Sequence, residues 1–230
     1  MRYSNTLTGT FIERPNRFIA YVEIGGKKEK CHVKNTGRCR ELLVPGAEVI
    51  LHASDAPGRS TGYDLIGVYK GDMLVNIDSQ APNGIVAESI RSIPGFEDAE
   101  EVRREYTYGN SRIDIFARAG GRKMLMEIKG VTLEKNGTAL FPDAPTERGL
   151  KHVRELEASL KEGYEGYIMF LIQMSGPKIF TPHYEMDGDF ASEVDRAQRA
   201  GVKVLAYDCT VTEDSVFLGR PIEVRLRDHS

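Results

Sequence analysis

Apolar and polar positions alternate most regularly between residues 111 and 129, in two runs separated by Gly120-Gly121. Two alternating runs joined by a two-residue glycine turn are typical of a β-hairpin. This turn places Asp114 directly across from Glu127, and Lys129 then points to the same side as both acids. The opposite face carries Ile113, Ile115, Ala117, Met124, Met126 and Ile128. We therefore expect one hairpin face to pack and the other to display charge.

Short strand-like runs separated by Gly and Pro occupy the chain before residue 80. A series of short strands with no long helical pattern predicts a small β-barrel over residues 1–81. The expected strands are Thr6 to Glu13, Phe18 to Ile24, Glu29 to Val33, Ala47 to His52, Leu65 to Tyr69 and Met73 to Ile77.

Residues 82–230 predict a second domain of mixed α/β structure. Pro82-Asn83-Gly84 indicates a break, and Ile85 to Arg91 indicates a short helix. After the hairpin, Thr146 is an expected N-cap, and an apolar stripe from Leu150 to Leu160 indicates a helix. The apolar run Tyr167 to Ile172 predicts a buried strand, so that strand, helix and strand form a βαβ unit. A further helix (Phe190 to Ala200) and strand (Val202 to Tyr207) complete a mixed central sheet flanked by helices.

The composition is that of an ordinary globular protein, with 40% hydrophobic and 28% charged residues. No run approaches the ~18 apolar residues of a membrane helix, and the start of the chain has no apolar signal core. We therefore expect a cytoplasmic protein without a membrane partner. Cys31, Cys39 and Cys209 are too few and too widely spaced for a disulfide framework or a zinc site.

The charge is unevenly distributed along the chain. The overall net charge is −3, but residues 1–59 hold 10 Lys and Arg against 6 Asp and Glu, a net of +4. A local basic surface on an acidic protein is compatible with binding a polyanion. The first third of the chain is therefore the expected basic surface.

The facing acids Asp114 and Glu127 are the main candidate for chemistry. Like charges on opposed strand positions repel each other, and a shared divalent cation such as Mg²⁺ or Mn²⁺ offsets the repulsion. With Lys129 beside them, the three form a candidate catalytic centre for phosphodiester cleavage, in which the lysine orients or deprotonates the attacking water. The alternative is a solvated hairpin face whose acid pair is relieved by Arg112 and Lys129.

Two further stretches are candidate phosphate contacts. The loop from Lys34 to Arg40 interleaves Lys34, Arg38 and Arg40 with small polar residues around Gly37. It either holds a phosphate or is a solvated turn. On the helix after Thr146, helical spacing places Arg148, Lys151 and His152 on one polar side, which faces either solvent or the acid pair. We interpret Asp143, just before that helix, as structural.

A family resemblance supports these assignments. The acids and the Glu127-Ile128-Lys129 run resemble the core of the restriction-endonuclease-like, or PD-(D/E)xK, superfamily, although Ile113 stands where that pattern often has Pro. Additional motifs make the whole chain resemble the sugar fermentation stimulation protein A family, although Cys39 stands where that family has Met. They are Asn35-Thr36-Gly37, Tyr108-Gly109-Asn110, Val131-Thr132-Leu133 and the run from Phe141 to His152.

The resemblance implies an OB-like barrel for residues 1–81 and a restriction-endonuclease-like domain for residues 82–230. It also implies sequence-nonspecific DNA binding, linked loosely to regulation of sugar, notably maltose, metabolism. The superfamily commonly takes a third acid from a helix before the core hairpin, so Glu88 is either a metal ligand with Asp114 and Glu127 or an ordinary exposed glutamate.

Our first hypothesis is therefore a DNA-binding protein that grips the phosphate backbone without reading bases. The alternative is an active Mg²⁺- or Mn²⁺-dependent nuclease that uses Asp114, Glu127 and Lys129. A carbohydrate-binding regulator is a third reading, which the absence of Trp disfavours. The expected partner is DNA, a homodimer is left open, and no small-molecule substrate is evident.

Overall fold

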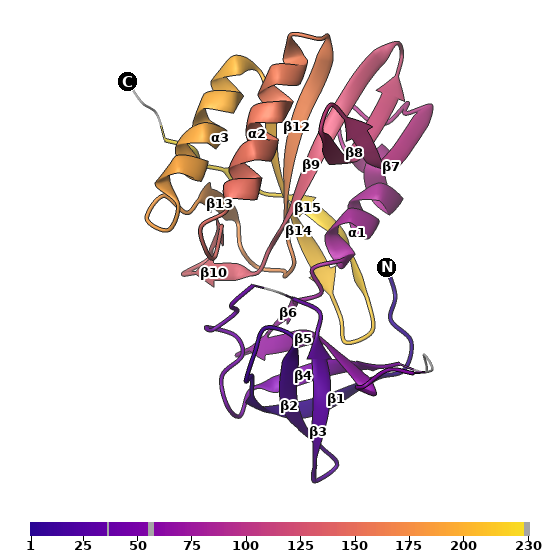
Figure 1. Ribbon diagram of the computed structural model, residues 1–230, viewed down its shortest axis with the longest axis vertical. Helices are drawn as coiled ribbons and strands as arrows, with labels where there is room; N and C mark the ends of the chain where they lie inside the picture. The colour runs from indigo at the N-terminus through magenta and orange to yellow at the C-terminus, as the bar shows by residue number, and fades with distance from the viewer. Residues whose placement is uncertain (36, 55–57, 228–230) are drawn as a thin grey trace.

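The first strands of the chain close into a small barrel, drawn in the lower half of Figure 1. The computed structural model describes residues 1–35, 37–54 and 58–227, so Thr36 of the Asn35-Thr36-Gly37 motif lies outside the described residues. The strands are β1 (Thr6–Glu13), β2 (Ile19–Ile24), β3 (Lys27–Val33), β4 (Glu48–Ala53), β5 (Tyr63–Lys70) and β6 (Met73–Asn76). They pair in the order β3-β2-β1-β4-β5-β6, and a parallel β3–β5 pairing closes a five-stranded ring. The predicted OB-like barrel is confirmed.

Alternation within the strands fills the barrel. Val22, Val49, Leu51 and Leu65 are completely buried in its core. Gly9 lies where β1 crosses this core, and a Cβ there would stand 2.6 Å from a methyl carbon of Val22. Glycine at this position therefore lets two strands approach more closely than any side chain would allow.

The second domain is built on a sheet with the order β15-β14-β12-β9-β8-β7. Its strands are β7 (Glu101–Tyr108), β8 (Ser111–Ala119), β9 (Arg122–Val131), β12 (Tyr164–Ile172), β14 (Lys203–Val211) and β15 (Val216–Pro221). Strand β12 is parallel to β9 and to β14, whereas β7, β8 and β15 are antiparallel to their neighbours. The mixed sheet and the strand-helix-strand unit agree with the sequence prediction.

Helices cover both faces of this sheet (Figure 1). Helix α1 (Ala81–Ser89) and the short 3₁₀ turn η1 (Ile90–Ser92) pack on one face, and α2 (Glu147–Leu160) and α3 (Gly188–Ala200) pack on the other. Thr146 caps α2 through Gly149, as expected, and Asp187 caps α3 through Phe190. Asp187 also accepts the backbone N–H of Thr146 at 2.8 Å, which ties the two helix starts together.

A second, small sheet was not anticipated from the sequence. It consists of β10 (Leu133–Lys135), β11 (Thr138–Phe141), β13 (Ile179–Pro182) and β16 (Glu223–Val224), in the order β10-β11-β13-β16. These strands are too short to produce a clear alternation, and two of the pairings join segments far apart in the chain. None of the helices in the described part of the chain is both long and apolar enough to span a bilayer.

Two local expectations were wrong. The Pro82-Asn83-Gly84 stretch is not a break but the first turn of α1, where a proline is tolerated because that N–H has no helical partner. The hairpin face expected to display charge is also buried, because α2 covers it and Phe116 and Leu125 belong to the core beneath that helix. Ile113 joins this same core, whereas Ile115 belongs to the core under α1. Residues two apart on a regular strand share a face, so the alternation of faces along β8 is interrupted between Ile113 and Ile115, at Asp114.

The barrel contains an ion-pair cluster that makes its stability depend on pH. Asp64 is 5% exposed; it accepts hydrogen bonds from Arg59 and is bonded to Nδ1 of His32 at 3.0 Å. Burial raises the pKa of Asp64, but the bonds from Arg59 and His32 outweigh burial and lower it below its ordinary value. An acid whose pKa is lower in the folded state stabilises the fold at neutral pH, and this contribution disappears as the pH falls through the folded-state pKa.

We expect Asp64→Asn to lower the melting temperature most at pH 7, and the effect to shrink as the pH falls through the lowered folded-state pKa of Asp64, where the carboxyl is protonated in the folded protein as well as in the unfolded chain. Melting curves from pH 2 to 8 test this prediction. The exposed Asp72 in the β5–β6 turn provides a control, because Asp72→Asn changes the same charge without touching the cluster. If Asp64→Asn lowers the melting temperature equally at every pH, Asp64 stabilises the barrel through packing and not through its charge.

Candidate functional site

Asp114 lies where the β8–β9 pairing ends. The predicted register is confirmed from Ile115 opposite Met126 to Ala119 opposite Arg122. At the next position, Oδ2 of Asp114 accepts the backbone N–H of Ile128 at 2.8 Å. Its other oxygen, Oδ1, accepts the side-chain amide of Asn83 on α1 at 2.7 Å. Burial and the neighbouring charge of Glu127 raise the pKa of Asp114.

Glu127 is a buried carboxylate with a lysine and a histidine as neighbours. It is 2% exposed, and its Oε1 accepts a hydrogen bond from Nζ of Lys129 at 2.8 Å and is also bonded to Nδ1 of His152 on α2. Burial raises the pKa of Glu127, but the bonds to His152 and Lys129 lower it by more, so that the net shift is downward. The pKa of Glu127 is therefore shifted in favour of the ionised form, whereas that of Asp114 is shifted against it.

The second oxygen of Glu127, Oε2, is buried and has no hydrogen-bond partner. A buried carboxylate oxygen without a partner is unfavourable and requires an explanation such as a bound ion. Two carboxylates and water are a donor set that Mg²⁺ accepts, since it keeps several waters and commonly binds through one or two acids. Asp114 and Glu127 therefore fit a hard divalent cation. No group of three or more His, Cys, Asp or Glu able to hold a metal occurs among the described residues.

The structure does not bring Glu88 to this pair. Glu88 is 62% exposed on its side chain and binds the amino group of Met1 at 3.0 Å. Asn83 is the α1 residue that contacts Asp114, and a position five residues later lies about 140° away around a helix. Glu88 is therefore the exposed glutamate of the second interpretation, and the α1 residue that contacts Asp114 is Asn83, an amide and not a third acid.

The site lies beside the junction between the two domains. Gly130, directly after Lys129, packs against Gln173, and a Cβ on Gly130 would stand 2.4 Å from the side-chain oxygen of Gln173. The amide of Gln173 donates to Oδ1 of Asn76 at 2.8 Å and to the carbonyl of Asp78 at 3.0 Å. The last residue of β6 and a residue just after it are thereby bonded to the residue that follows β12, next to Gly130.

The predicted basic loop of the barrel divides into two parts. Lys34 binds the completely buried Asp78 at 2.7 Å, so it is committed to the junction. Arg38 and Arg40 are exposed. The backbone N–H of Arg38 donates to Oδ2 of Asp143 at 3.2 Å, which places the loop against the segment that leads into α2. Asp143 is therefore a structural acceptor, as expected.

The three residues of α2 predicted to contact phosphate have different partners. His152 is buried against Glu127 and contributes to the acid centre. Arg148 is exposed, and its Nε lies 3.5 Å from Nε2 of His152. Lys151 is exposed and is paired with Glu155 at 3.6 Å. Arg112, the other expected partner of the acids, pairs instead with Glu105 at 3.6 Å.

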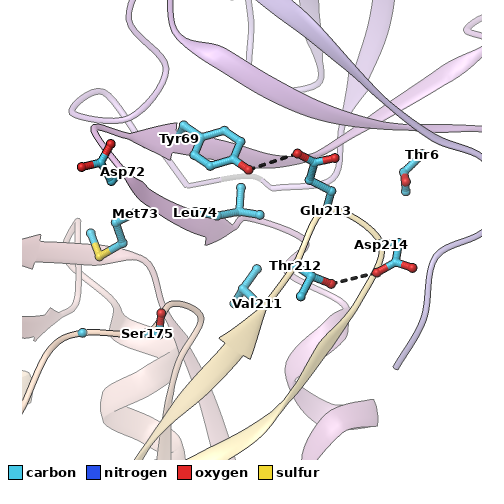
Figure 2. Close-up of a pocket in the computed structure, with 11 residues that line it drawn as sticks. Thr6, Tyr69, Asp72, Met73, Leu74, Ser175, Val211, Thr212, Glu213 and Asp214 are labelled. Carbon is cyan, nitrogen blue, oxygen red and sulfur yellow. Dashed lines mark hydrogen bonds between the residues drawn. The ribbon is translucent and has the colours of Figure 1, made fainter.

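A cavity of about 880 Å³ lies between the β5–β6 turn of the barrel and the β14–β15 turn of the second domain. Figure 2 shows Tyr69 bonded to Glu213 and Thr212 bonded to Asp214, with Asp72 on the same rim. Its described lining contains these three acids and no Lys, Arg or His. This cavity therefore repels phosphate, unlike the surface around Arg38.

The fold and the site together define a two-domain protein in which an OB-type barrel joins an α/β domain with an Asp-Glu-Lys centre. Two family models match the chain: the "SfsA N-terminal OB domain" over residues 12–77 and the "Sugar fermentation stimulation protein RE domain" over residues 80–215. The chain belongs to the sugar fermentation stimulation protein family.

Curated relatives match along nearly the entire length. A homolog from Desulfitobacterium hafniense is 52% identical, covering 98% of this chain and 99% of its own length. A homolog from Clostridium beijerinckii is 49% identical, and the match covers 98% of this chain and 100% of the homolog. The solved structure of Pyrococcus furiosus SfsA in complex with Ca²⁺ is 26% identical, with a TM-score of 0.88 and 98% of each chain covered.

We expect Glu127→Gln to destabilise the metal-free protein by about 1–3 kcal/mol, because Lys129 and His152 lose their charged acceptor while remaining largely buried. Chemical denaturation in chelator measures the change. Glu134→Gln is a matched control, since Glu134 is also a mostly buried acid paired with a lysine, Lys70, but stands outside the site. Equal stability of wild type and Glu127→Gln would contradict the ion-pair network.

Proposed function

We propose that this protein binds DNA through the phosphate backbone without reading base sequence. One observation carries the proposal: the bond from Arg38 to Asp143 places the exposed cations of the barrel loop next to the start of α2, which carries Arg148. Arg38, Arg40 and Arg148 thus come from both domains. Arginine side chains that reach phosphate oxygens position a protein on DNA and carry no sequence information of their own.

The distribution of charge supports this proposal. The overall negative charge keeps most of the surface from attracting a polyanion, and the acidic cavity between the β5–β6 and β14–β15 turns repels it there. The backbone is therefore guided to the side of the junction that carries the barrel loop and α2. Regulation of sugar metabolism is the proposed cellular setting, and the description of the family as sugar fermentation stimulation proteins supports it; the link to maltose is part of the proposal.

We expect the double variant Arg38→Ala/Arg40→Ala to bind all duplex sequences about equally weakly. Each arginine that neutralises one phosphate contributes to counterion release, so the slope of log affinity against log salt flattens by up to about two units. Fluorescence anisotropy across a salt series measures both quantities.

The matched control is Arg103→Ala/Arg118→Ala, which removes two exposed arginines that pair with Glu101 on β7. This variant removes the same charge at a distance from the loop. If the two double variants lose affinity and slope equally, binding depends on net charge and not on the barrel loop.

A second candidate function is metal-dependent hydrolysis of phosphodiester bonds, favoured by the buried, unpartnered Oε2 of Glu127. Asp114 and Glu127 would hold a divalent cation such as Mg²⁺ or Mn²⁺. When bound, such an ion supplies polarisation of a phosphate oxygen and charge neutralisation. The identity of the metal in this chain is part of the proposal.

The other residues of the site have roles that follow from their contacts. Asn83 and the N–H of Ile128 orient the Asp114 carboxylate from two directions. His152 holds Oε1 of Glu127 from the side of α2 and leaves Oε2 free. Lys129, 13% exposed and 2.8 Å from Oε1, is placed to orient an attacking water and to stabilise negative charge on the phosphate.

We expect millimolar Mg²⁺ or Mn²⁺ to raise the melting temperature of the wild type by mass action, and Asp114→Asn and Glu127→Gln to lose this response. Any metal-dependent cleavage of labelled DNA should disappear in both variants. Lys129→Ala should retain the metal response and lose at least about tenfold in cleavage.

Glu134→Gln, outside the site, should keep both the metal response and any cleavage. A wild type that shows no thermal response to either metal overturns the metal site. If the wild type responds thermally to metal but does not cleave DNA, the metal bound by Asp114 and Glu127 is structural and the protein only binds DNA.

A further inference from the structure

A second concave surface lies on the barrel beside the loop that carries Arg38 and Arg40. It is a cavity of about 620 Å³ between the β1–β2 turn, the segment 37–45 and Ala144 of the other domain. This volume falls within the range of small-ligand sites. Arg14, Arg17, Arg38 and Arg40 line it against a single acid, Glu13, which is paired with Lys28 at 2.7 Å.

Arg14 organises this pocket from within. Its Nη1 donates to the carbonyls of Gly37 and Arg38 at 2.8 and 2.9 Å. Its Nη2 donates to those of Arg17 and Asn35 at 2.7 and 2.6 Å. One guanidinium thus binds the two loops of the cavity together by their backbones. The side chains of the exposed Arg17, Arg38 and Arg40 remain available to an anion.

Apolar groups accompany these cations. Phe11, Leu43 and Pro45 form part of the wall of the cavity. Large hydrophobic side chains that are exposed in the described part of the chain are Phe18, Val44 and Phe217. Phe18 follows Arg17 in the chain and Val44 lies between Leu43 and Pro45, so two of these three are sequence neighbours of residues that line the cavity. The Phe18 ring is 51% exposed, and the Arg17 guanidinium carbon lies 5.9 Å from its centroid.

An exposed aromatic ring beside a cluster of arginines matches one ligand chemistry better than others. Proteins that bind single-stranded nucleic acid combine a basic groove with aromatic rings on which bases stack. A base within a duplex has both faces covered by its neighbours, so only an unpaired base can lie on such a ring. A free phosphate would use the arginines but would leave the ring and the apolar wall exposed.

We propose that this pocket binds an unpaired nucleotide of a single strand, with the base on Phe18 and the flanking phosphates on Arg38 and Arg40. The proposal rests on the proposed nucleic-acid binding and adds a preference for single strands. A DNA strand and an RNA strand share the chemistry that the pocket recognises. Because Ala144 belongs to the segment that leads into α2, a strand anchored here continues toward Arg148 and the acid centre.

The test is fluorescence anisotropy, in chelator, of the full-length protein with oligo-dT, oligo-U and a blunt mixed-sequence duplex. We expect Phe18→Ala to weaken binding of the preferred single strand about tenfold, since stacking on one ring contributes that much, and to change duplex binding less than about twofold. Phe18→Tyr, which keeps the ring, should retain binding. The tighter of oligo-dT and oligo-U identifies the natural strand type.

The chain offers a matched control in Phe217 on β15. Its ring is 40% exposed and also lies beside an arginine, Arg2, at 5.7 Å, but Arg2, unlike Arg17, does not line the pocket. Phe217→Ala should bind every strand like the wild type, and unchanged melting temperatures would show that the variants fold.

Equal weakening of single strand and duplex by Phe18→Ala, or no weakening, overturns the pocket while leaving backbone binding intact. A wild type that binds none of the three nucleic acids overturns the proposed DNA binding as well. These two failures are therefore distinguished in one set of measurements.

Discussion

The burial of the Glu127 carboxylate is the constraint on which the second domain depends. An ionised acid that is 2% exposed inside a sheet is strongly unfavourable unless cations and hydrogen bonds surround it. Lys129 provides one cation from the same strand, and His152 provides a donor from α2. The position of α2 over the sheet and the chemistry of the centre are therefore set by the same contacts. The second carboxylate oxygen, Oε2, has no hydrogen-bond partner within the protein.

Buried polar contacts at the junction connect the end of β9 to the barrel. Gln173 contacts Gly130 on one side and is bonded to Asn76 and Asp78 on the other. The buried Asp78 in turn holds Lys34 at the base of the basic loop. Satisfying buried polar groups across the junction thus brings the base of the basic loop, at Lys34, to the same junction as Gly130, the residue after Lys129.

Local sequence rules predicted much of the fold. The glycine turn at residues 120 and 121 placed the β8–β9 register correctly, because a two-residue turn leaves one pairing available. Thr146 was recognisable as a cap because its hydroxyl accepts the free N–H of Gly149, a contact within one helical turn. Where contacts became long-range, prediction failed. The small sheet needs partners from residues 133 to 224, and no local pattern marks them.

The sequence by itself determined which groups can do chemistry: two acids and a lysine on a hairpin, and arginines on a barrel loop. Only the tertiary structure decided which of them act together. Glu88 faces Met1 because helical geometry turns it away from Asn83, and Lys34 is drawn to Asp78 because a buried charge requires a partner. His152 changes from a surface cation to a partner of Glu127 because α2 packs onto the sheet. Burial and packing, which depend on residues distant in the chain, assign each charge its partner.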